Sequence, residues 1–205
     1  MDTETQKKQL ASLFSRIKLI VLSPKECWDT ISNEDENPQT ILKTKVIPLL
    51  IVGALCTVVG YEIFGRAIGA LGTWRPPLIS FTVSTIVMGV LEVVKLYIAA
   101  WLIQKLASFF QGNATPTRSF SLAAHAMLPV LAGQVLNIFP PLGLLGIVLL
   151  IITIYAFYQG VPRMTTVPQN QALGFTASFI VSMILISLFL GVLAGVIITT
   201  PAPGI

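Results

Sequence analysis

The chain has 205 residues, of which 54% are hydrophobic and only 11% charged, and its formal net charge is +4 at pH 7. Soluble domains average about 25% charged residues, so this composition and a mean hydropathy of +0.82 exclude an ordinary soluble domain. The positive residues are scattered along the chain, which argues against a nucleic-acid partner. The length leaves room for one helical membrane bundle and a short soluble N-terminal region.

The first predicted element is a basic amphipathic helix over residues 6–22. Such a helix lies at the headgroups of a bilayer, held by apolar burial and by attraction to anionic lipid. The alternative is that its apolar stripe packs on the cytoplasmic face of the bundle, and both can hold together. The apolar stripe consists of Leu10, Leu13, Phe14, Ile17, Ile20 and Val21, and the basic residues off the stripe include Arg16 and Lys18.

A second, short helix is predicted over residues 24–32. Ser23 is a candidate N-cap, Pro24 suits the first helical position, and Glu26 would complete a capping box. The polar stretch at 33–38 then predicts a solvated loop. Residues 1–45 therefore form a cytoplasmic N-terminal region, and the first long apolar run comes too late for a cleavable signal peptide.

Long apolar stretches fill the rest of the chain and predict an all-α membrane protein, a five-helix bundle. A membrane-spanning helix needs about 20 mostly apolar residues, because backbone polar groups must be satisfied inside the helix. The five predicted spans cover residues 46–64, 78–103, 120–139, 142–158 and 175–199, and residues 200–205 form a tail.

Lysine and arginine counts predict the orientation of the bundle. Ten of these residues flank the spans on the N-terminal side, against only Arg66 and Arg75 on the other. Positive residues near span ends favour the cytoplasm. We therefore expect a multi-pass membrane protein with a cytoplasmic N-terminus and an extracytoplasmic tail.

Glu92 and Lys95 are two charged residues near the middle of the second span. A lone charge at that depth costs roughly 2.5–3.5 kcal/mol on insertion scales, and residues three apart share a helix face. We expect the two side chains to pair and to face the bundle interior. The pair either forms part of a polar path or ligand site, or only fixes the register of the helix.

Three further polar residues lie in the third span. His125 has no carboxylate at helical spacing, so a proton relay is not indicated, and it points away from Gln134. Gln134 and Asn137 share a face, and amides at such positions typically bond across a bundle. We expect all three to make polar contacts within the bundle.

The fifth span carries Ser187, Gly191 and Gly195 at intervals of four residues. Small residues at this spacing permit close helix packing, either within one bundle or between two copies in a homodimer. Partners would then be the lipid bilayer and a second copy or another membrane protein.

Sequence motifs of enzymes are absent. No HExxH, GxSxG, Walker or Cys/His metal-binding pattern occurs in the sequence. We therefore expect no catalytic residue, no metal, no cofactor and no enzymatic activity.

Four local patterns together resemble the Yip domain family, integral membrane proteins named for interacting with Ypt/Rab GTPases, and specifically its short bacterial members. The resemblance runs from residue 16 to about residue 193. The patterns are SPKECWDTI at 23–31, VIPL at 46–49, HAMLP at 125–129 and YAFYQGVPR at 155–163.

This resemblance implies a five-helix domain with a cytosolic N-terminus, in agreement with the charge count. Eukaryotic members are adaptors in vesicle traffic between the endoplasmic reticulum and the Golgi, and they usually carry a longer cytosolic N-terminal segment. The chain lacks that segment, which argues against a GTPase partner and favours a bacterial plasma membrane as its location. The family supplies no catalytic residues.

Two functions are consistent with the sequence. The first is a non-enzymatic membrane protein that organises the bilayer or partner proteins, through the N-terminal helix and the small residues of the last span. The alternative is a small transporter, channel or lipid-handling protein that uses Glu92 and Lys95.

Overall fold

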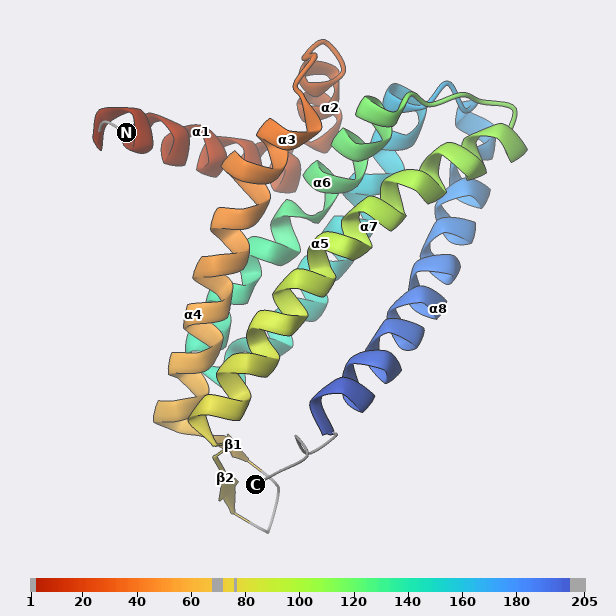
Figure 1. Ribbon diagram of the computed structural model, residues 1–205. Helices are drawn as coiled ribbons and strands as arrows, with labels where there is room; N and C mark the ends of the chain where they lie inside the picture. The colour runs from red at the N-terminus through yellow and green to blue at the C-terminus, as the bar shows by residue number, and fades with distance from the viewer. Residues whose placement is uncertain (1–2, 68–71, 76, 200–205) are drawn as a thin grey trace.

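The protein is described from a computed structural model that defines the backbone of residues 3–67, 72–75 and 77–199. Long helices run side by side, and α1 lies across one end of them (Figure 1). The elements in chain order are α1 (Thr3–Leu22), α2 (Pro24–Ile31), α3 (Pro38–Ile41), the π-helical turn η1 (Leu42–Val46), α4 (Ile47–Phe64), β1 (Arg66–Ala67), β2 (Thr73–Trp74), α5 (Leu78–Phe109), α6 (Pro116–Gly133), the 3₁₀ segments η3 (Gln134–Ile138) and η4 (Pro140–Leu144), α7 (Leu145–Met164), η5 (Gln169–Gln171) and α8 (Ala172–Thr199).

Five helical stretches are long and apolar enough to cross a bilayer, as the sequence predicted: Pro38–Phe64, Leu78–Phe109, Pro116–Ile138, Pro140–Met164 and Gln169–Gly195. The helical fold class is confirmed. The one addition within the described residues is a small antiparallel hairpin between α4 and α5, which pairs Arg66 with Trp74 and Ala67 with Thr73. It lies at the end of the bundle opposite α1 (Figure 1).

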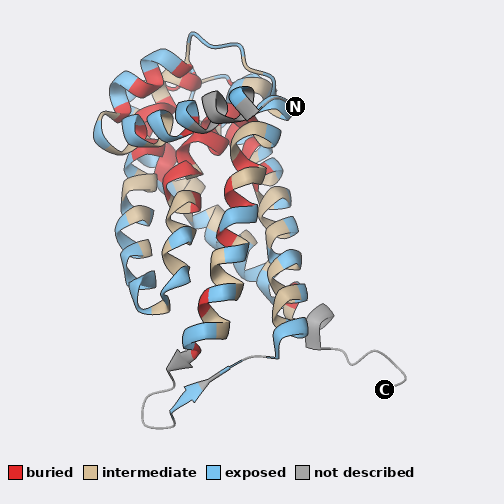
Figure 2. Ribbon diagram, turned by 90° about the vertical axis from the view of Figure 1, so that its left-hand side faces the viewer, coloured by how far each residue is buried: buried red, intermediate tan, exposed pale blue. Residues whose placement is uncertain are grey.

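Helix α6 is the centre of the bundle. In its most apolar stretch 61% of the residues are buried, against 6% in α8, so the other long helices surround α6 and turn apolar side chains outward. Outward apolar surface is stable only in hydrocarbon, which fits a bilayer as solvent. Buried residues gather at the end of the bundle next to α1 (Figure 2).

A π-helical turn precedes α4 and has a clear cause in the sequence. Pro48 has no backbone N–H, so the carbonyl of Thr44 loses its usual helical partner. The ladder shifts by one residue, and the N–H of Ile47 bonds to the carbonyl of Leu42. The helix begins at Pro38 and continues through this turn, eight residues ahead of the predicted first span.

The third predicted span is not one continuous α-helix. It changes to 3₁₀ geometry at Gln134, where it packs closely on α4. A Cβ atom on Gly60 would lie 2.1 Å from the backbone oxygen of Asn137, and one on Gly53 would lie 2.4 Å from Oε1 of Gln134. Glycine at these two positions therefore allows the segments to touch.

Helix α2 begins differently from the predicted capping box. The Ser23 side chain makes no capping hydrogen bond. Instead the backbone N–H of Ser23 donates to the carbonyl of Leu19 at 2.8 Å, which continues the hydrogen bonding of α1. The chain therefore bends between α1 and α2 with little interruption of its backbone bonds.

Candidate functional site

Glu92 and Lys95 lie one turn apart on α5 and form an ion pair, with Lys95 Nζ 2.5 Å from Glu92 Oε1. Both side chains are only partly exposed, at 30% and 22%. The two opposite charges neutralise each other, which lowers the free-energy cost of placing ionised groups in hydrocarbon. Both residues line a cavity that is partly open between the helices.

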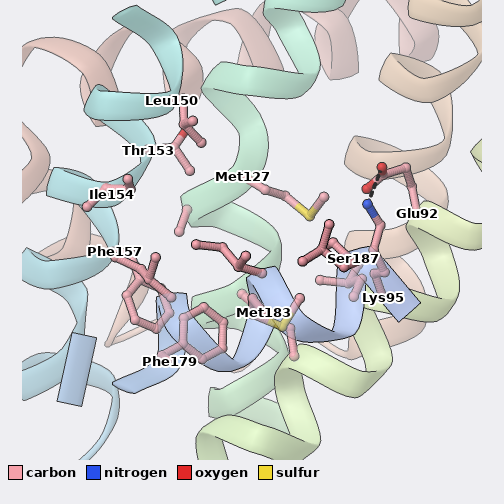
Figure 3. A pocket seen from close by; sticks show the side chains of 17 residues that line it. Glu92, Lys95, Met127, Leu150, Thr153, Ile154, Phe157, Phe179, Met183 and Ser187 are labelled. Carbon is pink, nitrogen blue, oxygen red and sulfur yellow. Dashed lines mark hydrogen bonds and ion pairs between the residues drawn. The ribbon is translucent and has the colours of Figure 1, made fainter. Parts of the chain in front are cut away.

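That cavity has a volume of about 520 Å³ and lies between α5, α6, α7 and α8. Its walls are largely apolar, with Phe157, Phe179 and Met183 among them (Figure 3). The exceptions are the ion pair, Thr153 and Ser187. A volume of this size is typical of a site for one small ligand.

His125 is fully buried next to the α1 end of the bundle. Its Nδ1 lies 2.9 Å from the Ser121 carbonyl and its Nε2 lies 3.0 Å from Lys45 Nζ. Lys45 also pairs with Glu36. His125 therefore joins α6 to the segment before α4, and the structure does not bring it to Glu92 or Lys95.

The two amides of the third span lie at the opposite end of the bundle from His125. Asn137 Nδ2 donates to Thr57 Oγ1 on α4 at 3.1 Å. Gln134 packs against Gly53 of the same helix. These residues join α4 to η3 and form no site with His125.

The short helix α2 docks deeply into the bundle. Trp28 is fully buried, and its indole N–H donates to the carbonyl of Ala156 at 2.8 Å. A Cβ atom on Gly160 would lie 2.6 Å from the Trp28 ring, so glycine is what lets the ring reach α7. Outside the bundle, Arg163 Nε bonds to Asp29 Oδ1 at 2.5 Å.

Cys27, the neighbour of Trp28 on α2, is also buried and is 0% exposed. Burial raises the pKa of the Cys27 thiol, although the nearby Arg16 opposes the shift. Because the thiolate is the reactive form, Cys27 is a packing residue and an unsuitable target for modification in the folded protein.

Helix α1 divides the predicted apolar stripe into two faces. Leu13 and Ile20 are buried against the bundle and Ile17 packs beside them. Phe14 is 67% exposed and Leu22 68% exposed, and Lys18 lies exposed between them. The Leu10 side chain lies outside the described residues.

Arg16 fixes the docked face of α1. Its guanidinium donates to both oxygens of Glu34, at 2.7 and 2.9 Å. Burial acts to lower the pKa of Arg16, but the Glu34 carboxylate outweighs it and the pKa is raised. Arg16 therefore stays charged and ties α1 to the loop that follows α2.

Among the residues that the structure describes, the small residues of α8 make no close contact with another helix. A Cβ atom added at Gly191 or Gly195 would have no atom within 4 Å, and Ser187 is exposed at the cavity rim. The close packing within the bundle comes instead from Gly53, Gly60 and Gly160. A contact between two copies of α8 stays a prediction.

Sequence reasoning missed two polar residues that the structure makes notable. Thr153 is the only hydroxyl inside a long apolar run before Tyr155, and its buried Oγ1 has no hydrogen-bond partner in the structure. Glu62 lies inside the first span, and its buried Oε1 is likewise unpaired. A search for single polar residues within each span would have found both.

The four motifs of the sequence analysis meet at one place in the structure. Segment 23–31 packs against α7 at Gly160, the Trp28 ring meets the His125 ring edge-on at 6.5 Å, and Lys45, next to the second motif, contacts His125 of the third. They form the surface that fastens the N-terminal segment to the bundle. We call this surface, made of Trp28, His125, Ala156 and Gly160, the docking site.

Comparison with known proteins agrees with this geometry. The Yip1 domain family matches residues 18–198, which include all four motifs and the five apolar helical stretches. Neither the curated proteins nor the solved structures contain a match to the chain. The chain is a multi-pass membrane protein that belongs to the Yip1 domain family.

Proposed function

We propose that this protein is a non-enzymatic membrane protein that organises the bilayer, or partner proteins within it, at the cytoplasmic face. The observation that carries the proposal is the two-faced helix α1. One face, Leu13 and Ile20, is held on the bundle, and the other exposes Phe14, Lys18 and Leu22. Apolar and basic side chains together on an exposed helix face suit a bilayer surface rich in anionic lipid.

The position of α1 supports this role. It crosses the end of the bundle and projects beyond α4 (Figure 1), so it can lie along the headgroups next to the spans. Burying a Phe side chain is worth roughly 1.5–3 kcal/mol, and a Lys near an anionic surface adds about 1 kcal/mol. Because Leu13, Ile20 and the Arg16–Glu34 ion pair already hold the helix on the bundle, little of this free energy is lost in ordering it. The distribution of lysine and arginine supports a cytoplasmic location for this end, in a plasma membrane.

Phe14→Asp is expected to abolish the effect of the protein on lipid distribution. The carboxylate cannot enter the apolar boundary beneath the headgroups and is repelled by anionic lipid, whereas the buried face of α1 is left intact. The measurement is the self-quenching of fluorescent phosphatidylglycerol in vesicles that contain the purified protein. The wild-type protein should raise quenching by gathering the anionic lipid, and Phe14→Asp should return it to the value of protein-free vesicles.

Ser108→Asp is the matched control, because Ser108 is exposed near the C-terminal end of α5 and the variant introduces the same charge outside α1. It should quench like the wild type. Equal quenching with and without the wild-type protein would refute the proposal.

A second candidate function is transport or lipid handling through the cavity at Glu92 and Lys95. The cavity itself favours it, although five helices are few for an alternating-access carrier unless two copies combine. In vesicles, proton, ion or lipid flux should change in Glu92→Gln and stay unchanged in Glu62→Gln, an intramembrane carboxyl outside the cavity. Equal flux with and without the protein would remove this candidate.

A further inference from the structure

We propose that the cavity between α5, α6, α7 and α8 is a binding site for a neutral lipid of the diacylglycerol class, with one chain inside the cavity and the hydroxyl-bearing head at Glu92 and Lys95. The inference develops the second candidate function, but it concerns binding only. It holds whether or not the protein moves the lipid.

The position and size of the cavity suit one lipid chain. It has about 520 Å³ and is walled by four membrane helices, with α8 forming one side (Figures 1 and 3). Pockets of about 300–1,000 Å³ hold one small ligand, so the space suits one lipid chain. The cavity is partly open between its helices, and at this depth an opening meets hydrocarbon. Its occupant therefore comes from the bilayer.

Most of the cavity wall is apolar. Phe157 and Phe179 stack on each other with ring centroids 4.3 Å apart, and Met183 lies beside them. Aromatic and thioether side chains offer polarisable contacts that adapt to a flexible chain. Such a wall selects a hydrocarbon tail and excludes a polar solute.

Polar groups stand on three of the four helices that wall the cavity. Glu92 and Lys95 lie on α5, with Ser187 of α8 beside Lys95, and Thr153 lies across on α7 (Figure 3). Lys95 donates to one carboxylate oxygen of Glu92, which leaves the second carboxylate oxygen free to accept a hydrogen bond from a ligand hydroxyl. The buried Oγ1 of Thr153 has no partner in the structure, and an unpaired buried hydroxyl is costly.

The depth of the polar groups in the membrane selects a neutral lipid head. At a helical rise of about 1.5 Å per residue, Glu92 lies about 21 Å from the start of α5 at Leu78 and about 26 Å from its end at Phe109. A phosphate drawn to that depth would be an uncompensated charge, because the Glu92–Lys95 pair is neutral as a whole. A hydroxyl with ester carbonyls can pair with the carboxylate, the ammonium and the two hydroxyl side chains at no cost in charge.

The test uses the full chain in phosphatidylcholine vesicles with a trace of diacylglycerol that carries a photoactivatable diazirine on one chain. After illumination, mass spectrometry maps the labelled peptides. We expect labelling concentrated on the wall residues of α7 and α8, between 150 and 157 and between 179 and 188. A phosphatidylcholine probe with the same diazirine chain should label these segments about tenfold less, as expected from the loss of one charge-assisted hydrogen bond.

Ser187→Trp should fill the polar end of the cavity and remove the labelling. Val192→Trp is the matched control, because Val192 lies five residues further along α8, is exposed and does not line the cavity. The double variant Glu92→Met with Lys95→Met leaves the apolar wall intact and should lower diacylglycerol labelling about tenfold, with the unfolding temperature measured alongside.

Equal labelling by the two probes, unchanged labelling in Ser187→Trp and in the double variant, or labelling spread evenly over all outward helix faces would each overturn the proposal. These outcomes are independent of lipid flux. A failure of binding is therefore distinguishable from a failure of transport.

Discussion

Trp28→Ala is expected to lower the stability of the protein by about 3–5 kcal/mol, the range for removing a large buried aromatic side chain. Trp28 is fully buried, donates to the Ala156 carbonyl and fills the space left by Gly160. Its loss leaves a cavity between α2, α6 and α7. The N-terminal segment should then separate from the bundle well below the temperature at which the bundle unfolds.

The reactivity of Cys27 measures this separation, because Cys27 lies next to Trp28 on α2 and is buried while the segment is docked. In a Cys56→Ala background, maleimide should modify Cys27 slowly in the folded protein and rapidly in Trp28→Ala. Trp101→Ala is the matched control, since Trp101 is 57% exposed on α5, and it should leave Cys27 protected. Protection of Cys27 in Trp28→Ala would show that the docking site does not hold the segment.

Gly60→Ala is expected to be the most damaging small substitution in the bundle. The added methyl group would lie 2.1 Å from the backbone oxygen of Asn137 and 2.8 Å from that of Ile138. Backbone cannot turn aside as a flexible side chain can, so α4 and η3 must move apart. Overpacking of this kind costs typically 1–3 kcal/mol, and the Asn137–Thr57 hydrogen bond should be lost as well.

The measurement is the unfolding temperature of the purified protein in detergent. Gly191→Ala is the matched control, because the same methyl group there meets no atom within 4 Å. Alanine also favours a helix over glycine by about 1 kcal/mol, so Gly191→Ala should be neutral or slightly stabilising. A similar fall in both variants would mean that the close α4–η3 contact is not present in the protein.

The sequence predicted the features that depend on local pattern. Span number and approximate position follow from length and apolarity, and the two N-terminal helices follow from apolar spacing and Pro24. The pairing of Glu92 with Lys95 needs only helical spacing. These features depend on residues within a few turns of one another, so no tertiary information is needed.

Features that depend on distant contacts could not be predicted. The Trp28–Ala156 hydrogen bond joins positions 128 residues apart, and a helix pattern cannot say which helix receives the ring. The division of the α1 stripe into buried Leu13 and exposed Phe14 depends on where the bundle lies. Similarly, the glycines of α8 match a packing motif, yet the contacts within the chain are made by Gly53 and Gly60 of α4.

The central claim is that five helices cross the bilayer with α1 and the α7–α8 link on the cytoplasmic side. Single cysteines at the exposed positions Ser15, Thr73 and Asn170, in a background without Cys27 and Cys56, report it most directly. In sealed right-side-out membrane vesicles, an impermeant maleimide should label Thr73→Cys at once, and Ser15→Cys and Asn170→Cys only after permeabilisation. Labelling of Ser15→Cys and Thr73→Cys from the same side of the sealed membrane would contradict the account.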